Sequence, residues 1–223
     1  MTMTRTACCR PTPVRRTAAL LAAAVALGAS LGACSPDRVG SAAVIDGRTV
    51  SSDDLQATAR AYLAVVPGGD AGDAQRSILQ RMIVSAAIDE AAREAGVRVR
   101  DGQVAAERDQ VLESVGGRKG LIRTLAQSQQ PTVLAPQDVD RWIKDRLLFR
   151  AIAEEIAGVP LDPEAPETQQ ALNETNDRLR QASEGIVVEL SPRYGTWDPA
   201  TGLVPLVSGG LSKTAAELDD SGS

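Results

Sequence analysis

The apolar positions between Asp73 and Gly96 recur at steps of three and four residues, the period of a helix rather than of a strand. They are Ile78, Leu79, Met82, Ile83, Ala86, Ala87, Ala91 and Ala95, with Val84 and Ile88 widening the stripe. The carboxylate of Asp73 would cap the N–H groups of the first turn, and Gly96 would end the helix in the left-handed conformation. Such a helix is roughly 34 Å long. Its wide stripe predicts that other helices cover it from more than one side.

The stretch before this helix predicts a hairpin followed by a shorter helix. Residues 42–45 and 48–50 have strand composition, and Asp46-Gly47 between them supplies the positive φ angles of a two-residue turn. Ser51 then stands as the N-cap of a helix, with an acid three residues later as in a capping box. We expect this helix to run to about Val66.

Four more helices and a strand are predicted after Gly96, separated by Gly and Pro residues. The expected helices are 102–115, 121–129, 136–157 and 163–184, and the expected strand is 186–190. Asp101 would cap the first of these helices. Residues 191–207 are predicted to be a loop with room for one short strand, and residues 208–223 a disordered tail. The fold class is therefore mainly α, with a helical core closed by a small sheet from both ends of the chain.

The first 33 residues have the pattern of a lipoprotein signal peptide. Arg15 and Arg16 precede an apolar run from Ala18 to Leu31, which is too short to span a membrane as a helix. The run ends in Leu-Gly-Ala followed by Cys34, an aliphatic residue and two small ones before the cysteine. This pattern predicts Sec export, cleavage before Cys34 and attachment of diacylglycerol to its thiol. Residues 34–41 would then be a short tether, and residues 42–207 the folded domain.

Composition excludes several classes of function. From Cys34 onward the chain has 20 basic and 29 acidic residues, a net charge of −9, and it has few aromatic residues. An acidic domain of this kind is a poor nucleic-acid binder. The sequence has no histidine, and no free thiol remains once Cys34 is acylated, so the common nucleophile–base pairs are absent. We therefore expect no enzyme activity, no metal and no cofactor. A hydrolase of unknown chemistry is a remote alternative.

The order of these parts resembles the N-terminal domain of SurA-like envelope chaperones and PrsA-type foldases. The resemblance rests on "AAVIDGRTVSSDDL", the long helix, "EAGVRVRDGQVAAE", a Gly-Gly break and "DRLLFRAIAEEI", and it covers residues 42–156. The closing "SPRYGTWDP" is similar to the actinobacterial lipoprotein branch of that family. The resemblance implies a cradle that binds extended, apolar segments of exported proteins. The parvulin domain of the prolyl isomerases in this family is missing, and so are its histidines, so no isomerase activity is expected.

Six residues are candidates for the lining of such a cradle: Tyr62, Met82, Trp142, Arg146, Phe149 and Arg150. Trp142 and Phe149 lie seven residues apart, so they share one helix face, and two arginines lie beside them. This pattern fits a groove floor with a basic rim, but it also fits core packing with arginine stems that reach solvent.

The expected function is that of a non-enzymatic, membrane-anchored chaperone whose partners are unfolded exported polypeptides. The alternative is an interaction subunit that is dedicated to one complex of the cell envelope.

Overall fold

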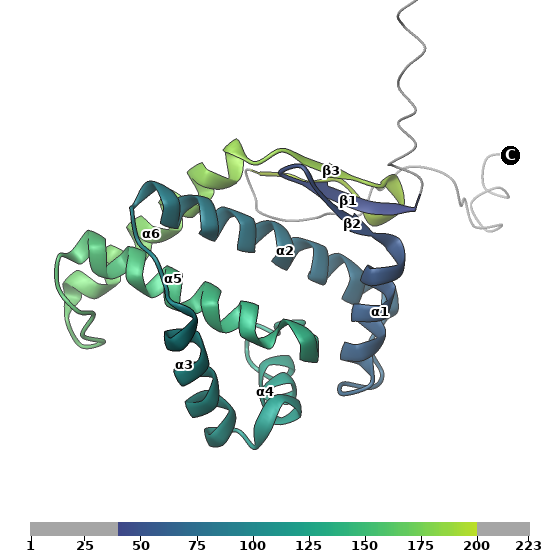
Figure 1. The fold of residues 1–223 in the computed structure, drawn as a ribbon, viewed down its shortest axis with the longest axis horizontal. Helices are drawn as coiled ribbons and strands as arrows, with labels where there is room; N and C mark the ends of the chain where they lie inside the picture. Colours follow the sequence, from purple (N-terminus) through teal and green to yellow (C-terminus); the bar gives the residue numbers. More distant parts are fainter. Residues whose placement is uncertain (1–39, 200–223) are drawn as a thin grey trace, which may run out of the picture. The chain divides into compact units, whose positions relative to one another are not determined.

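The computed structural model describes residues 40–199, which form six α-helices and a three-stranded sheet (Figure 1). In chain order the elements are β1 (Ser41–Ile45), β2 (Arg48–Ser51), α1 (Ser52–Leu63), α2 (Ala71–Glu94), α3 (Asp101–Ser114), α4 (Gly117–Ala126), the 3-10 turn η2 (Pro136–Asp138), α5 (Val139–Ala157), α6 (Pro166–Gly185), β3 (Val188–Leu190) and the 3-10 turn η3 (Pro192–Tyr194). The predicted fold class, mainly α with a small sheet, is confirmed at this level.

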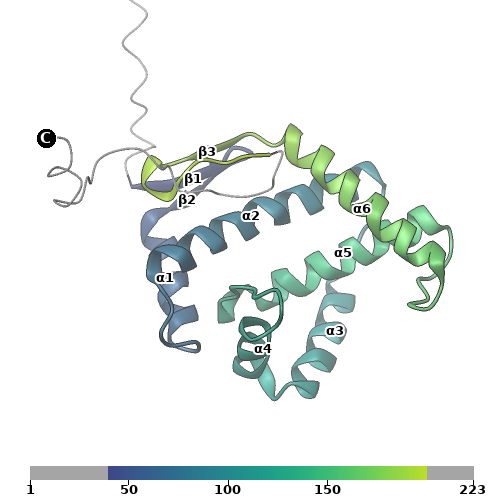
Figure 2. The ribbon, with the colours of Figure 1, turned by 180° about the vertical axis from the view of Figure 1, so that it is seen from behind.

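The sheet joins the beginning and the end of the described chain. Its strand order is β2-β1-β3 with both pairings antiparallel, so β1 is the central strand. The predicted hairpin turn is confirmed, because Asp46 and Gly47 have φ angles of 48° and 75°. β3 returns after α6 to lie beside β1, as Figures 1 and 2 show from opposite sides. In this pairing Leu190 lies opposite Ala43. The strand predicted at 186–190 is shorter, at Val188–Leu190.

The cap of α1 is the predicted one, and the cap of α2 is not. The Ser51 hydroxyl accepts a hydrogen bond from the Asp54 N–H at 3.0 Å and donates one to its carboxylate at 2.7 Å. α1 ends at Leu63 rather than near Val66. In α2 the cap is Asp70, whose carboxylate accepts from the Asp73 N–H at 2.8 Å, so the helix starts a turn earlier than predicted. Both aspartates suit a first turn, and the pattern alone did not separate them.

Of the glycines that were interpreted as breaks, Gly116 and Gly117 do separate α3 from α4, whereas Gly120 does not interrupt a helix. α4 begins at Gly117, directly after Gly116, and it includes Gly120. A Cβ at Gly120 would lie 1.7 Å from the carbonyl oxygen of Val115, the C-cap residue of α3, so this glycine allows the end of α3 to approach the first turn of α4 closely. The helix predicted at 121–129 is therefore wrong by four residues at its start and three at its end. α3 likewise begins at Asp101 with Arg100 as N-cap, one residue earlier than expected.

The last two helices keep the predicted order with shifted ends. Pro136 opens a 3-10 turn that leads into α5, which ends at Ala157 before Gly158. α6 starts at Pro166 in place of the predicted 163, with the proline in the first turn where its missing N–H costs nothing. The loop expected after residue 190 begins with η3.

Three clusters of buried side chains hold these elements together. The first lies between the sheet, α1 and the first half of α2, with Leu55 and Ile78 fully buried. The second lies between the second half of α2, α5 and α6, around Ile152. The third lies beside α4 and the start of α5, around Ile143. α2 contributes to two clusters and α5 to two, so the packing of α2 against α5 connects the whole core, and α2 has the central position expected for it.

Several predictions concern residues outside the described range. The signal peptide at 1–33, Cys34, most of the tether at 34–41 and the tail at 208–223 all lie there. Within residues 40–199, no helix is both long enough and apolar enough to cross a membrane.

Candidate functional site

A groove of about 420 Å³ opens between α2, α5, α6 and the link that joins α5 to α6. Its aromatic and aliphatic lining comes from all of these parts of the chain. The residues are Val84 and Ile88 of α2, Trp142 and Phe149 of α5, Leu161 of the link and Leu172 of α6. Ile88 belongs to the second core cluster, so the floor of the groove is continuous with the core. An open hollow lined in this way suits apolar side chains of another chain.

Four of the six candidate residues meet in this groove. Trp142, Arg146, Phe149 and Arg150 project from one face of α5 and all line it. The guanidinium of Arg146 stacks over the Trp142 ring, 4.8 Å from its centroid. Trp142 and Phe149 are half-buried and the two arginines are exposed. Trp142 also packs against the third core cluster, so both interpretations of this residue, core and groove, describe part of its surroundings.

The other two candidates lie elsewhere. Tyr62 is buried in the first core cluster with 8% of its surface exposed, and this burial raises the pKa of its hydroxyl. Met82 packs against the same cluster and lines a second hollow, of about 590 Å³, between the sheet, α2 and α6. Neither residue lines the groove on α5.

The residues of α2, α6 and the link that line the groove were not identified as candidates from the sequence. Leu172 lies in a helix with polar residues at most positions, and Leu161 lies in a short link beside prolines. The wide stripe on α2 was the one signal that included Val84 and Ile88, but nothing in it separates groove positions from core positions.

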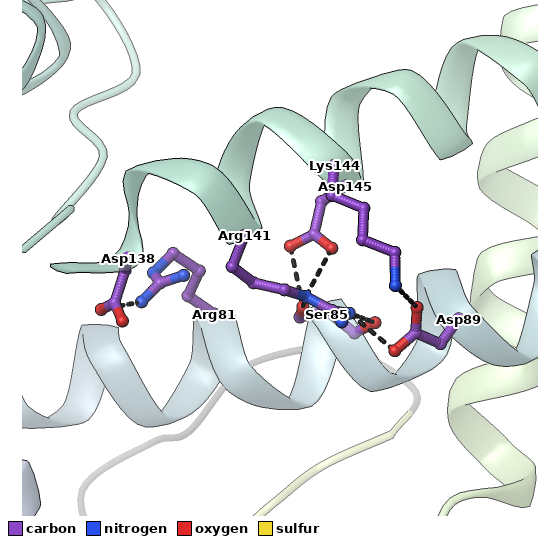
Figure 3. Close-up of polar contacts among 7 residues, drawn as sticks. All are labelled: Arg81, Ser85, Asp89, Asp138, Arg141, Lys144 and Asp145. Atoms are coloured by element: carbon purple, nitrogen blue, oxygen red, sulfur yellow. Dashed lines mark hydrogen bonds and ion pairs between the residues drawn. The ribbon is translucent and has the colours of Figure 1, made fainter. Parts of the chain in front are cut away.

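A polar cluster joins α2 to α5 beside the groove (Figure 3). Ser85 of α2 donates a hydrogen bond to the Asp145 carboxylate at 2.8 Å and accepts one from Arg141 Nε at 2.5 Å. Arg141 also donates to the Ser85 carbonyl and to Asp89, both at 2.8 Å. Arg81 pairs with Asp138 at the start of α5. These contacts fix the spacing and register of the two helices that form the groove.

Asp145 is the most deeply buried charge of this cluster, with 7% of its surface exposed. Burial raises the pKa of its carboxyl, while the nearby Arg141 guanidinium and the hydrogen bond from Ser85 oppose that rise. Arg141 Nε lies 2.9 Å from Asp145 Oδ1, but its N–H is directed at the Ser85 hydroxyl. Oδ1 therefore has an ion-pair partner and no hydrogen bond from the described residues. Because Arg81, Ser85 and Asp145 all line the groove, this cluster forms its polar end.

The cluster is better suited to a structural role than to catalysis. The Ser85 hydroxyl lies next to the Asp145 carboxylate, but no histidine exists in the chain to transfer a proton between them. Within the part of the chain that the structure describes, no three acidic or cysteine side chains come together as a metal site.

Comparisons with protein-family models, with curated proteins and with solved structures find no match to this chain.

Proposed function

We propose that this protein is a lipid-anchored chaperone of the cell envelope that binds unfolded or extended segments of exported proteins. The observation that carries the proposal is the apolar groove on α5, which Trp142 and Phe149 line together with two exposed arginines. A groove that makes few specific contacts favours broad recognition over one sequence. Binding would rest on buried apolar area, so we expect dissociation constants of about 1 μM or weaker for single segments.

The order of the elements supports the resemblance to the SurA-type domain. A hairpin, a capped helix, a long helix and a Gly-Gly break occur in the described chain in that order. In SurA-like proteins a C-terminal helix and strand return to complete this domain, and α6 and β3 follow α5 in the same way. We therefore propose a SurA-like chaperone module whose sheet is completed by β3.

The link between α5 and α6 supports the absence of prolyl isomerase activity. It covers residues 158–165. A segment of this length cannot hold an inserted domain, which typically needs at least about 50 residues. The chain also has no histidine for a parvulin-type site.

The anchor is proposed from the sequence. The apolar run that ends at Leu31, the two small residues after it and Cys34 itself are the features of a lipoprotein signal. A diacylglycerol on Cys34 would hold the folded domain at the outer face of the cytoplasmic membrane, where exported chains emerge unfolded.

A dedicated interaction subunit is the second candidate. Val159 and Val187 are large apolar residues with 58% and 62% of their surfaces exposed. Two such valines would suit permanent contact with one folded partner, although isolated apolar residues are common on protein surfaces.

Photo-crosslinking in cells separates the two candidates. A photoreactive amino acid placed at Leu161, in the groove, is compared with one at Glu113, which is exposed on α3. The chaperone proposal predicts many different exported proteins crosslinked at Leu161 and few at Glu113. A single partner at Leu161 would favour the dedicated subunit. Equal labelling at both positions would contradict a binding role for the groove.

A further inference from the structure

The rim of the groove is basic although the protein is acidic. Residues 40–199 contain 18 basic and 25 acidic residues, a net charge of −7. The groove nevertheless is lined by three arginines and one carboxylate. That carboxylate, Asp145, is held by Ser85 and Arg141, and one of the arginines, Arg81, is paired with Asp138. The charges that remain available at the groove are therefore both positive.

These two charges belong to Arg146 and Arg150. Both are exposed. Neither forms an ion pair with a carboxylate among the described residues. Other arginines that face a neighbouring helix are paired, as Arg118 is with Asp140 and Arg178 with Glu155. Stacking on Trp142 occupies the flat face of the Arg146 guanidinium. Its N–H edge stays free for a planar acceptor, and a carboxylate matches that edge with two parallel hydrogen bonds.

The spacing along α5 suits an extended ligand. Arg146 and Arg150 are four residues apart, so they are about 6 Å apart along the helix axis. In an extended chain, residues two apart lie on the same side and about 6.6 Å from each other. A segment that lies along α5 would place an acidic side chain at one arginine while its apolar side chains reach Trp142 and Phe149.

We propose that the groove selects extended apolar segments that carry an Asp or Glu side chain beside their apolar residues, and that Arg146 and Arg150 recognise this carboxylate. The inference rests on the proposed function, because it specifies the ligand of the same groove. Segments rich in Lys and Arg are repelled by the rim and bind less well.

The probe is a set of three 12-residue peptides with a neutral fluorophore at the N-terminus and an amide at the C-terminus. Each peptide has two Leu and one Phe separated by Ser. The three peptides differ only at two positions, which are both Glu in the first, both Gln in the second and both Lys in the third. Binding is followed by fluorescence anisotropy with the full chain in phosphatidylcholine nanodiscs, and empty nanodiscs serve as the blank. The Glu peptide should bind about five- to tenfold more tightly than the Gln peptide, and the Lys peptide should bind least.

A matched pair of variants assigns the preference to the rim. Arg146→Gln with Arg150→Gln should remove the advantage of Glu over Gln. Arg60→Gln with Arg123→Gln changes the net charge equally at two exposed arginines outside the groove and should keep that advantage. In about 1 M salt the advantage should shrink in the wild type, because the Debye length falls to about 3 Å.

The outcomes separate the inference from the function on which it rests. Equal binding of the Glu and Gln peptides, or equal loss in both double variants, would overturn the carboxylate preference and leave a general apolar groove. A version of the Gln peptide with a free C-terminal carboxylate is added for comparison, and its tighter binding than the amidated Glu peptide would overturn the choice of a side-chain carboxylate. Absence of binding by all three peptides would overturn both the inference and the peptide-binding function.

Discussion

Replacing Ser85 by alanine should lower the free energy of unfolding by about 2 kcal/mol. The Ser85 hydroxyl is buried, with 6% of the residue exposed, and it connects the Asp145 carboxylate at 2.8 Å with Arg141 at 2.5 Å. Hydrogen bonds to charged groups contribute about 1.5–3 kcal/mol, and their loss leaves a buried carboxylate less well solvated. For a chain of this size the melting temperature should fall by about 4–8 °C.

Ser183 provides the matched control. It is also a buried helical serine, with 8% exposed, but its hydroxyl only donates to the Leu179 carbonyl of its own helix at 2.8 Å. Such a back-bond contributes little to stability, so Ser183→Ala should cost less than about 0.5 kcal/mol. The two substitutions remove the same atom, and the difference between them isolates the contribution of the polar cluster.

Urea unfolding of the full chain in nanodiscs, followed by circular dichroism, measures both variants against the wild type. Asp145→Asn alone and Asp145→Asn combined with Ser85→Ala complete a double-mutant cycle, and the losses of the two single variants should be clearly less than additive. If Ser85→Ala costs no more than Ser183→Ala, or if the cycle is additive, the polar cluster does not hold α2 against α5.

Three further predictions concern the charge of Asp145, the backbone at Gly120 and the position of Tyr62 in the core. Asp145→Asn should become progressively less stable relative to the wild type as pH falls from about 7 to 3.5. Burial raises the pKa of Asp145 in the folded state, so protonation of this carboxyl stabilises the folded wild type. That contribution is fully present below the ordinary pKa of 3.8 and is lost as pH rises through the raised pKa. An unchanged or reversed difference in urea unfolding would contradict the raised pKa. Gly120→Ala should cost about 2 kcal/mol or more, because its Cβ would collide with the Val115 carbonyl, whereas Gly102→Ala, which meets nothing within 4 Å, should be neutral or stabilise α3 by about 0.5 kcal/mol; equal melting temperatures would refute this. Tyr62→Phe should change stability by less than about 0.5 kcal/mol and leave peptide binding unchanged, since Tyr62 packs in the first core cluster; weaker peptide binding in the anisotropy assay would show that it acts in the groove.

The features that could be predicted from sequence are those that depend on near neighbours. The turn at Asp46-Gly47, the cap formed by Ser51 and the stop at Gly96 each follow from the conformational preference of one or two residues. The face shared by Trp142 and Phe149 follows in the same way from helical periodicity.

The features that could not be predicted depend on contacts between distant residues. Ser85 and Asp145 are 60 residues apart in the chain, and no local pattern pairs them. Leu172 completes the groove only because α6 folds back on α2 and α5. Gly120 was interpreted as a helix break because glycine favours turns. Its role, which is to leave room for the Val115 carbonyl, is visible only in the structure.

The most direct test of the chaperone function follows the aggregation of two unrelated unfolded proteins by light scattering. The full chain in nanodiscs is added at equal molar concentration, and it is compared with empty nanodiscs and with a Trp142→Ala, Phe149→Ala variant whose folding is checked by circular dichroism. The proposed function predicts that the wild type suppresses the aggregation of both proteins and that the folded variant suppresses it much less. Aggregation of both proteins at the same rate as with empty nanodiscs would contradict the proposal.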